Sequence, residues 1–121
     1  MLFRSNTGLT LTICANYGGR WDMANACRRL MNEGYRPEDM TEELLSSRLA
    51  MAYAPDPDML IRTGGEARIS NFLLWQAAYS EFYFTETYWP DFDGDALDEA
   101  IASFQKRERR FGKTSEQVKA S

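Results

Sequence analysis

Two arginines, two glycines and a serine lie close together in one segment of this 121-residue chain, RTGGEARIS at residues 62–70. Guanidinium groups suit bidentate phosphate contacts, glycines let backbone N–H groups approach a ligand, and a hydroxyl at a helix start favours anions. The segment follows a predicted strand and precedes a predicted helix, where open α/β sheets bind ligands. It therefore predicts a phosphate or diphosphate site with Arg62, Arg68 and Ser70. The alternative is that both arginines pair with Glu66 or with acidic residues further along the chain.

Glu81 is a second candidate, because a carboxylate suits Mg²⁺, which is usually held by one or two carboxylates plus substrate phosphates. For a single acidic residue at a helix end, solvent exposure is the commoner outcome. The aromatic residues from Phe82 to Trp89 could line a cavity for an apolar substrate, although such clusters more often form core. The chain has no histidine, which excludes Ser-His and Cys-His nucleophile pairs and His-based metal sites.

The amino-acid composition limits the class of protein to which this chain can belong. Apolar residues make up 44% and charged residues 26%, a balance typical of one folded globular domain. The net charge of −4 argues against general attraction to nucleic acid. The longest apolar run, Leu49–Ala54, is far below the ~18 residues that span a bilayer, and no secretory segment follows Met1. We therefore expect a cytoplasmic protein in which Cys14 and Cys27 are reduced and buried.

The elements that must position the candidate residues alternate between strand and helix. Three strands are predicted at residues 9–15, 59–63 and 82–85, and about four helices at 23–31, 41–52, 71–79 and from Asp95 through Phe111 to a stop at Gly112. Thr41 and Asp95 are the expected N-caps. This order predicts an α/β fold, part of a mostly parallel sheet flanked by helices. Three strands leave an edge of such a sheet open, which indicates an incomplete sheet.

The sequence from Arg62 to Gln76, RTGGEARISNFLLWQ, closely resembles the signature of the cis-prenyltransferases. The resemblance extends over the whole stretch from Asn6 to Gly112, and its other conspicuous parts are ANYGGRWD at 15–22, WPDF at 89–92 and RERRFG at 107–112. Ala67 departs from the family, in which that position is often His or another polar residue, so any contact from that side chain is absent here.

The resemblance implies a transferase that adds isopentenyl diphosphate, with cis geometry, to an allylic diphosphate such as farnesyl diphosphate. Its product would be a polyprenyl diphosphate, the lipid carrier of cell-wall synthesis, and its metal Mg²⁺. Arg62, Arg68 and Ser70 match the positions that hold the diphosphate of isopentenyl diphosphate, and Glu81 matches a metal-associated carboxylate. Family resemblance also implies a homodimer and peripheral contact with a membrane through the lipid product. No nucleic-acid partner is expected, because of the negative net charge.

The resemblance covers only the carboxyl-terminal half of the family's domain, which we assign to residues 1–112, with a polar tail at 113–121. In the family, the other half carries the Asp that anchors Mg²⁺, the loop that grips the allylic diphosphate and much of the product tunnel. We therefore expect a truncated half that is inactive alone. The alternatives are a non-catalytic partner subunit and a diphosphate-binding module unrelated to prenyl transfer.

Overall fold

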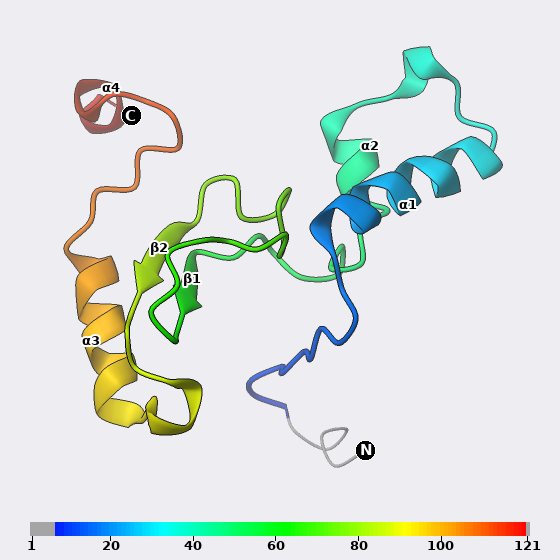
Figure 1. Ribbon diagram of the computed structural model, residues 1–121. Helices are drawn as coiled ribbons and strands as arrows, with labels where there is room; N and C mark the ends of the chain where they lie inside the picture. The colour runs from blue at the N-terminus through cyan, green and yellow to red at the C-terminus, as the bar shows by residue number, and fades with distance from the viewer. Residues whose placement is uncertain (1–6, 121) are drawn as a thin grey trace.

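The computed structural model describes residues 7–120, so that Asn6, where the resemblance starts, and Ser121, the end of the tail, lie outside the described residues. Figure 1 shows a central pair of strands between two groups of helices. In chain order the elements are α1 (Gly19–Asn32), a 3₁₀ turn (Pro37–Asp39), α2 (Glu42–Ser46), β1 (Met59–Arg62), β2 (Glu81–Phe84), a 3₁₀ turn (Trp89–Asp91), α3 (Gly94–Gln105) and α4 (Ser115–Lys119).

The two strands pair in parallel, as the alternating pattern predicted. Met59 lies opposite Glu81, and Arg62 lies opposite Phe84. Helix α3 packs along β2, while α1 packs on α2 on the other side of the strand pair (Figure 1). The α/β class and the parallel pairing are therefore confirmed.

The third predicted strand, at residues 9–15, is wrong for the described structure. This segment is not paired with a strand, and Leu9 and Ile13 are 89% and 78% exposed. A strand is held by hydrogen bonds to a neighbour, and among residues 7–120 only β1 and β2 pair. The segment is therefore rich in residues that favour strands, but it has no partner strand among residues 7–120.

The helix predicted at residues 71–79 is also absent, and the segment runs through turns instead. Ser70, Asn71 and Leu73 have φ angles of +50°, +63° and +47°, which a right-handed helix cannot contain. Ser70 therefore does not lie at a helix start, contrary to the prediction from the apolar run.

Helix ends follow local chemistry where a capping side chain is present. Thr41 accepts a hydrogen bond from the Leu44 amide, as predicted, although α2 ends at Ser46 rather than near residue 52. Helix α3 is capped by Asp93 rather than by the predicted Asp95.

The carboxyl-terminal region differs from the predicted continuous helix. Helix α3 ends at Gln105, so Phe111 does not extend its apolar stripe, and Gly112 sits in a separate turn with φ +78°. The predicted polar tail contains the short helix α4, which begins with a capping box formed by Thr114 and Gln117.

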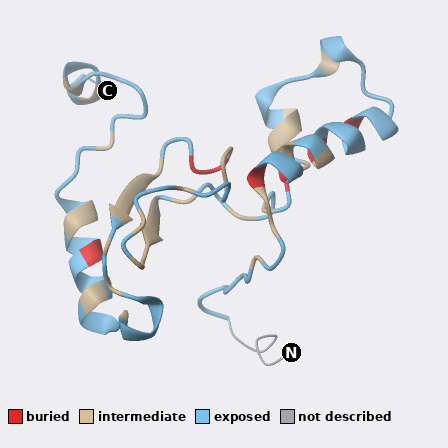
Figure 2. Ribbon diagram, viewed as in Figure 1, coloured by how far each residue is buried: buried red, intermediate tan, exposed pale blue. Residues whose placement is uncertain are grey.

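The core is small and the molecule is open. Its accessible surface is 9586 Å², against about 6,700 Å² for a compact monomer of this mass. Figure 2 shows buried residues as isolated patches on α1, the turns around it and α3. The buried apolar residues are Ala26, Leu30, Leu49, Ala77 and Ala100. The predicted burial of the two cysteines is wrong, because Cys27 is exposed and Cys14 is only partly buried. No helix in residues 7–120 is both long and apolar enough to cross a membrane.

Candidate functional site

Arg62 ends β1 and opens the segment predicted to bind diphosphate. The two glycines that follow have φ angles of +85° and +80°, a conformation that residues with a Cβ adopt only with strain. Gly64 N–H donates to the Thr87 carbonyl at 2.9 Å and Gly65 N–H to the Thr85 carbonyl at 3.0 Å. These amides fasten the loop to the segment after β2 and are not free for an anion, contrary to the role expected for them.

The side chains of the segment remain close to solvent. Arg62 Nη1 donates to the Arg68 carbonyl at 3.3 Å, which joins the two ends of the loop. The guanidinium of Arg68 forms an ion pair with Glu66, the local alternative considered from the sequence. Both partners of this pair are substantially exposed, so an incoming anion can compete for Arg68 at low cost.

Glu81 lies at the opposite end of the strand pair from the arginines. It begins β2 opposite Met59, whereas Arg62 lies opposite Phe84, so the register separates Glu81 from Arg62 by about 10 Å along the strands. Its carboxylate pairs with Arg107 Nη1 at 3.0 Å. Within this chain Glu81 and the Arg62–Ser70 segment do not form one site.

The basic run at residues 106–110 neutralises acids at this same end of the sheet. Arg107 pairs with Glu81, and Arg109 Nη1 pairs with Asp58 at 2.5 Å while its guanidinium lies 4.5 Å from the Phe111 ring centroid. In the sequence, this run is expected to lie in the last turns of the helix that starts at Asp95, where cations complement the helix dipole. That expectation is wrong, because the run begins after α3 ends at Gln105.

Metal ligands are sparse in the described residues. Residues 7–120 contain no group of three or more His, Cys, Asp or Glu side chains that could hold a metal ion. Glu81 offers a carboxylate oxygen of the kind that Mg²⁺ prefers, but the ligand set would need oxygens from outside this group. The donor chemistry fits Mg²⁺ only when substrate phosphates complete it.

The sequence analysis assigned no role to Asp22, a buried side chain with three hydrogen-bond partners. It is 1% exposed and accepts hydrogen bonds from Tyr17 Oη at 2.7 Å, the Ala50 amide at 2.8 Å and Gln76 Nε2 at 3.2 Å. Burial, and then the hydrogen bond to Asp22, raises the pKa of Tyr17 well above its usual value. A polar residue directly before the helix predicted at residues 23–31 was the available signal, but it does not distinguish burial from exposure.

Asn71 was also missed, and it completes the start of α1. Gly18, the N-cap, has no capping side chain. Instead Gly19 N–H donates to the Asn71 carbonyl and Arg20 N–H donates to Asn71 Oδ1 at 2.9 Å. Leu74 packs on Gly19, which is buried. The chain just beyond Ser70 is therefore anchored on α1.

Comparison with known proteins identifies relatives over nearly the whole chain. Residues 2–112 match the family model Prenyltransf, described as "Putative undecaprenyl diphosphate synthase". An isoprenyl transferase of Neisseria meningitidis serogroup B is 62% identical over 117 residues, which are 97% of this chain and 46% of that protein. A ditrans,polycis-undecaprenyl-diphosphate synthase ((2E,6E)-farnesyl-diphosphate specific) of Aliivibrio fischeri is 53% identical over 98% of this chain and 48% of its own length.

A solved structure gives the same result for the fold. Lavandulyl diphosphate synthase from Lavandula x intermedia, in complex with dimethylallyl diphosphate, superposes with a TM-score of 0.75 at 41% identity. The match covers 80% of this chain and 44% of that one. The chain thus spans about half the length of the relatives it matches.

Proposed function

Because this chain belongs to the undecaprenyl diphosphate synthase family of prenyltransferases, we propose that it is the part of a prenyl-transferring enzyme that binds isopentenyl diphosphate. The complete enzyme would add this unit, with cis geometry, to an allylic diphosphate such as farnesyl diphosphate. The product would be a polyprenyl diphosphate used in cell-wall synthesis. The observation that carries the proposal is the presence of Arg62, Arg68 and Ser70 in one solvent-facing loop at the end of β1.

On binding of the diphosphate, Arg68 would exchange its contact within the loop for a stronger contact with the ligand. Arg68 would leave Glu66, an exposed pair that contributes little to stability, and would donate to diphosphate oxygens. Arg62, which is half-buried and tied to the loop backbone, would provide a second guanidinium held in place. The Ser70 hydroxyl is exposed and could add a third donor.

The test is steady-state kinetics in the chain restored to full length with the amino-terminal half of a relative. Arg68→Ala should raise KM for isopentenyl diphosphate by about ten- to a hundredfold, since a charge-assisted contact contributes about 1.5–3 kcal/mol. Arg62→Lys should also weaken binding, because a point charge does not replace a planar fork. Arg28→Ala, which removes an exposed arginine of α1, is the matched control. An unchanged KM for isopentenyl diphosphate in the Arg68 variant would contradict the assignment of Arg68 to the diphosphate site.

We also propose that Glu81 serves Mg²⁺ together with the missing half of the enzyme and with diphosphate oxygens that are not held by the Arg62–Ser70 segment of the same chain. When bound, Mg²⁺ would neutralise diphosphate charge. Glu81 would have to share or release Arg107 to reach it. Glu81→Gln in the restored chain should require more Mg²⁺ to reach a lower maximal rate, whereas Glu99→Gln on the exposed face of α3 should not. An unaltered Mg²⁺ titration would leave Glu81 with only its ion pair to Arg107.

The 121-residue chain alone is proposed not to turn over, because transfer needs the allylic diphosphate held beside the second substrate. The unpaired segment at residues 9–15 and the open sheet favour aggregation in isolation. A separately made amino-terminal half should restore solubility and activity by supplying a strand. Incorporation of labelled isopentenyl diphosphate onto farnesyl diphosphate with Mg²⁺ measures this, and robust elongation by the isolated chain would refute it.

Three further expectations for the complete enzyme rest on family membership alone. They are a cytoplasmic location, a homodimer and peripheral contact with a membrane through the lipid product. The domain limits, residues 1–112 with a polar tail at 113–121, likewise stay predictions. Sedimentation of the restored chain would measure its oligomeric state, and flotation with vesicles after turnover would measure the membrane contact.

A further inference from the structure

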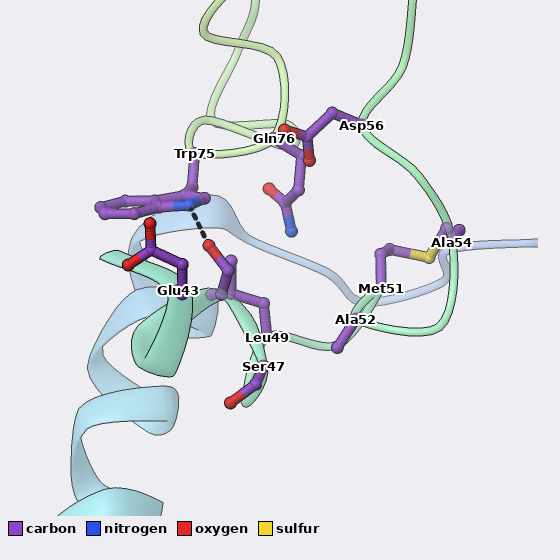
Figure 3. A pocket seen from close by; sticks show the side chains of 10 residues that line it. Glu43, Ser47, Leu49, Met51, Ala52, Ala54, Asp56, Trp75 and Gln76 are labelled. Atoms are coloured by element: carbon purple, nitrogen blue, oxygen red, sulfur yellow. Dashed lines mark hydrogen bonds between the residues drawn. The ribbon is translucent and has the colours of Figure 1, made fainter. Parts of the chain in front are cut away.

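A hollow lies between α2, the turns that follow it and the segment that carries Trp75 and Gln76 (Figure 3). Its volume is ≈ 170 Å³, and Leu49 and Met51 are among its apolar walls. A wider hollow of ≈ 690 Å³ shares Trp75 and two acidic residues with it. Neither hollow contains a residue of the proposed diphosphate site.

The inner hollow contains a buried acceptor without a donor. Gln76 is 7% exposed, and its Nε2 donates to Asp22 Oδ2 at 3.2 Å. A buried carboxylate such as Asp22 accepts but does not donate, so the amide nitrogen must face it, and this fixes the opposite orientation of Oε1. Gln76 Oε1 has no hydrogen-bond partner among the described residues. A buried carbonyl oxygen is costly without a donor, and Gln76 lines the inner hollow, so a donor that reaches Oε1 from the hollow by a small movement of the Gln76 side chain would be stabilised there.

The hollow is also negatively charged without compensation. Glu43 and Asp56 line both hollows, and Glu42 lines the wider one. No lysine or arginine lines either of them, and none of these three carboxylates has an ion-pair partner in residues 7–120. An occupant with a positive charge is therefore favoured over a neutral or anionic one.

Trp75 provides the aromatic wall. Its indole N–H donates to Ser46 Oγ at 2.8 Å, the contact drawn as a dashed line in Figure 3, which fixes the position of the ring. An indole face attracts cations and packs against aliphatic groups. A metal ion fits less well, because it needs several oxygen ligands at short range and only two carboxylates line the inner hollow.

We propose that this hollow binds a small primary ammonium compound with a short aliphatic stem. The ammonium N–H groups donate to Gln76 Oε1 and to the carboxylates of Glu43 and Asp56. The stem lies against Trp75, Leu49 and Met51. This combines a fixed acceptor, a negative rim and an aromatic wall, and it does not depend on the prenyltransferase function.

The test is a titration of the chain restored to full length with the amino-terminal half of a relative, labelled with ¹⁵N at its tryptophans, with n-propylammonium chloride. The indole resonance of Trp75, assigned with Trp75→Phe, should shift saturably with a millimolar dissociation constant, while those of Trp21 and Trp89 should not. Tetramethylammonium at equal ionic strength has no N–H donor and should bind about fivefold more weakly or not at all. Equal binding of both cations would overturn the role of Gln76.

Variants that remove one carboxylate distinguish binding in the hollow from a general attraction of cations to this acidic chain. Glu43→Gln and Asp56→Asn change exposed side chains and should each weaken n-propylammonium binding about two- to fivefold. Glu99→Gln makes the same chemical change on α3, outside the hollow, and should leave binding unchanged. Absence of a saturable shift overturns the proposal, and so does a response of Trp75 to MgCl₂ in place of the amine.

Discussion

The surroundings of Asp22 and the Arg62–Ser70 segment use polar side chains in opposite ways. Asp22 is buried and accepts hydrogen bonds from three separate parts of the chain. Arg68 is exposed and pairs with Glu66, only two residues away. The long-range polar contacts of this chain therefore hold its scaffold together, whereas the charged groups of the candidate site keep local partners that a ligand can displace.

The largest expected effect comes from breaking the buried region. Asp22→Ala removes the acceptor of three hydrogen bonds, two of them from buried or part-buried side chains. It should lower the free energy of unfolding by about 3–5 kcal/mol, measured by urea denaturation followed by circular dichroism. Asp98→Ala, on the exposed surface of α3, is the matched control. Equal effects of the two variants would contradict the role assigned to Asp22.

A smaller effect is expected where the segment beyond the candidate site meets α1. A Cβ added at Gly19 would lie 2.7 Å from Leu74 Cγ and 3.0 Å from the Leu74 amide nitrogen. Gly19→Ala should therefore destabilise the chain by about 1–3 kcal/mol and speed hydrogen exchange at the Arg20 amide. Gly94→Ala, where a Cβ meets nothing within 4 Å, should leave both quantities nearly unchanged. Unchanged exchange in the Gly19 variant would argue against the anchoring of α1 by Asn71.

The pH dependence of stability should report on Tyr17 in the same buried region. Its pKa is raised in the folded state, so its contribution to stability is fully present below the unfolded value of about 10 and is lost as pH rises above it. Tyr17→Phe should lower the free energy of unfolding by about 1 kcal/mol at neutral pH, because the hydrogen bond to Asp22 is lost. It should also reduce the loss of stability that occurs as the pH becomes alkaline. Unfolding midpoints between neutral and alkaline pH measure this. Tyr88→Phe, at an exposed site, should keep the alkaline slope.

The smallest effect on stability is expected in the candidate site itself. Arg68→Ala breaks an exposed ion pair and should change the free energy of unfolding by less than about 0.5 kcal/mol. The same variant should strongly raise KM for isopentenyl diphosphate in the restored enzyme. A large loss of stability would show that Arg68 supports the scaffold, and the comparison with Asp22 would then fail.

Local patterns predicted the elements whose signals lie within a few residues. The apolar spacing from Met23 to Met31 correctly gave α1, and Thr41 was correctly identified as the cap of α2. The helix predicted from the apolar run at 71–79 does not form. Hydrophobicity alone does not reveal that Asn71 accepts hydrogen bonds from the amides of Gly19 and Arg20. The strand predicted at 9–15 is not paired in the described residues, because strand propensity does not reveal whether a neighbouring strand is present.

The sequence by itself determined the chemical groups of the candidate site: Arg62, Arg68 and Ser70 in one glycine-containing loop after a strand. The tertiary structure alone decided that Asp22 is buried against Gln76, 54 positions away, and that Glu81 pairs with Arg107, 26 positions away. Helix periodicity and capping depend on residues within about four positions, so they can be predicted from a short stretch of chain. Burial and ion pairing between distant segments depend on how the whole chain folds, which no short stretch encodes.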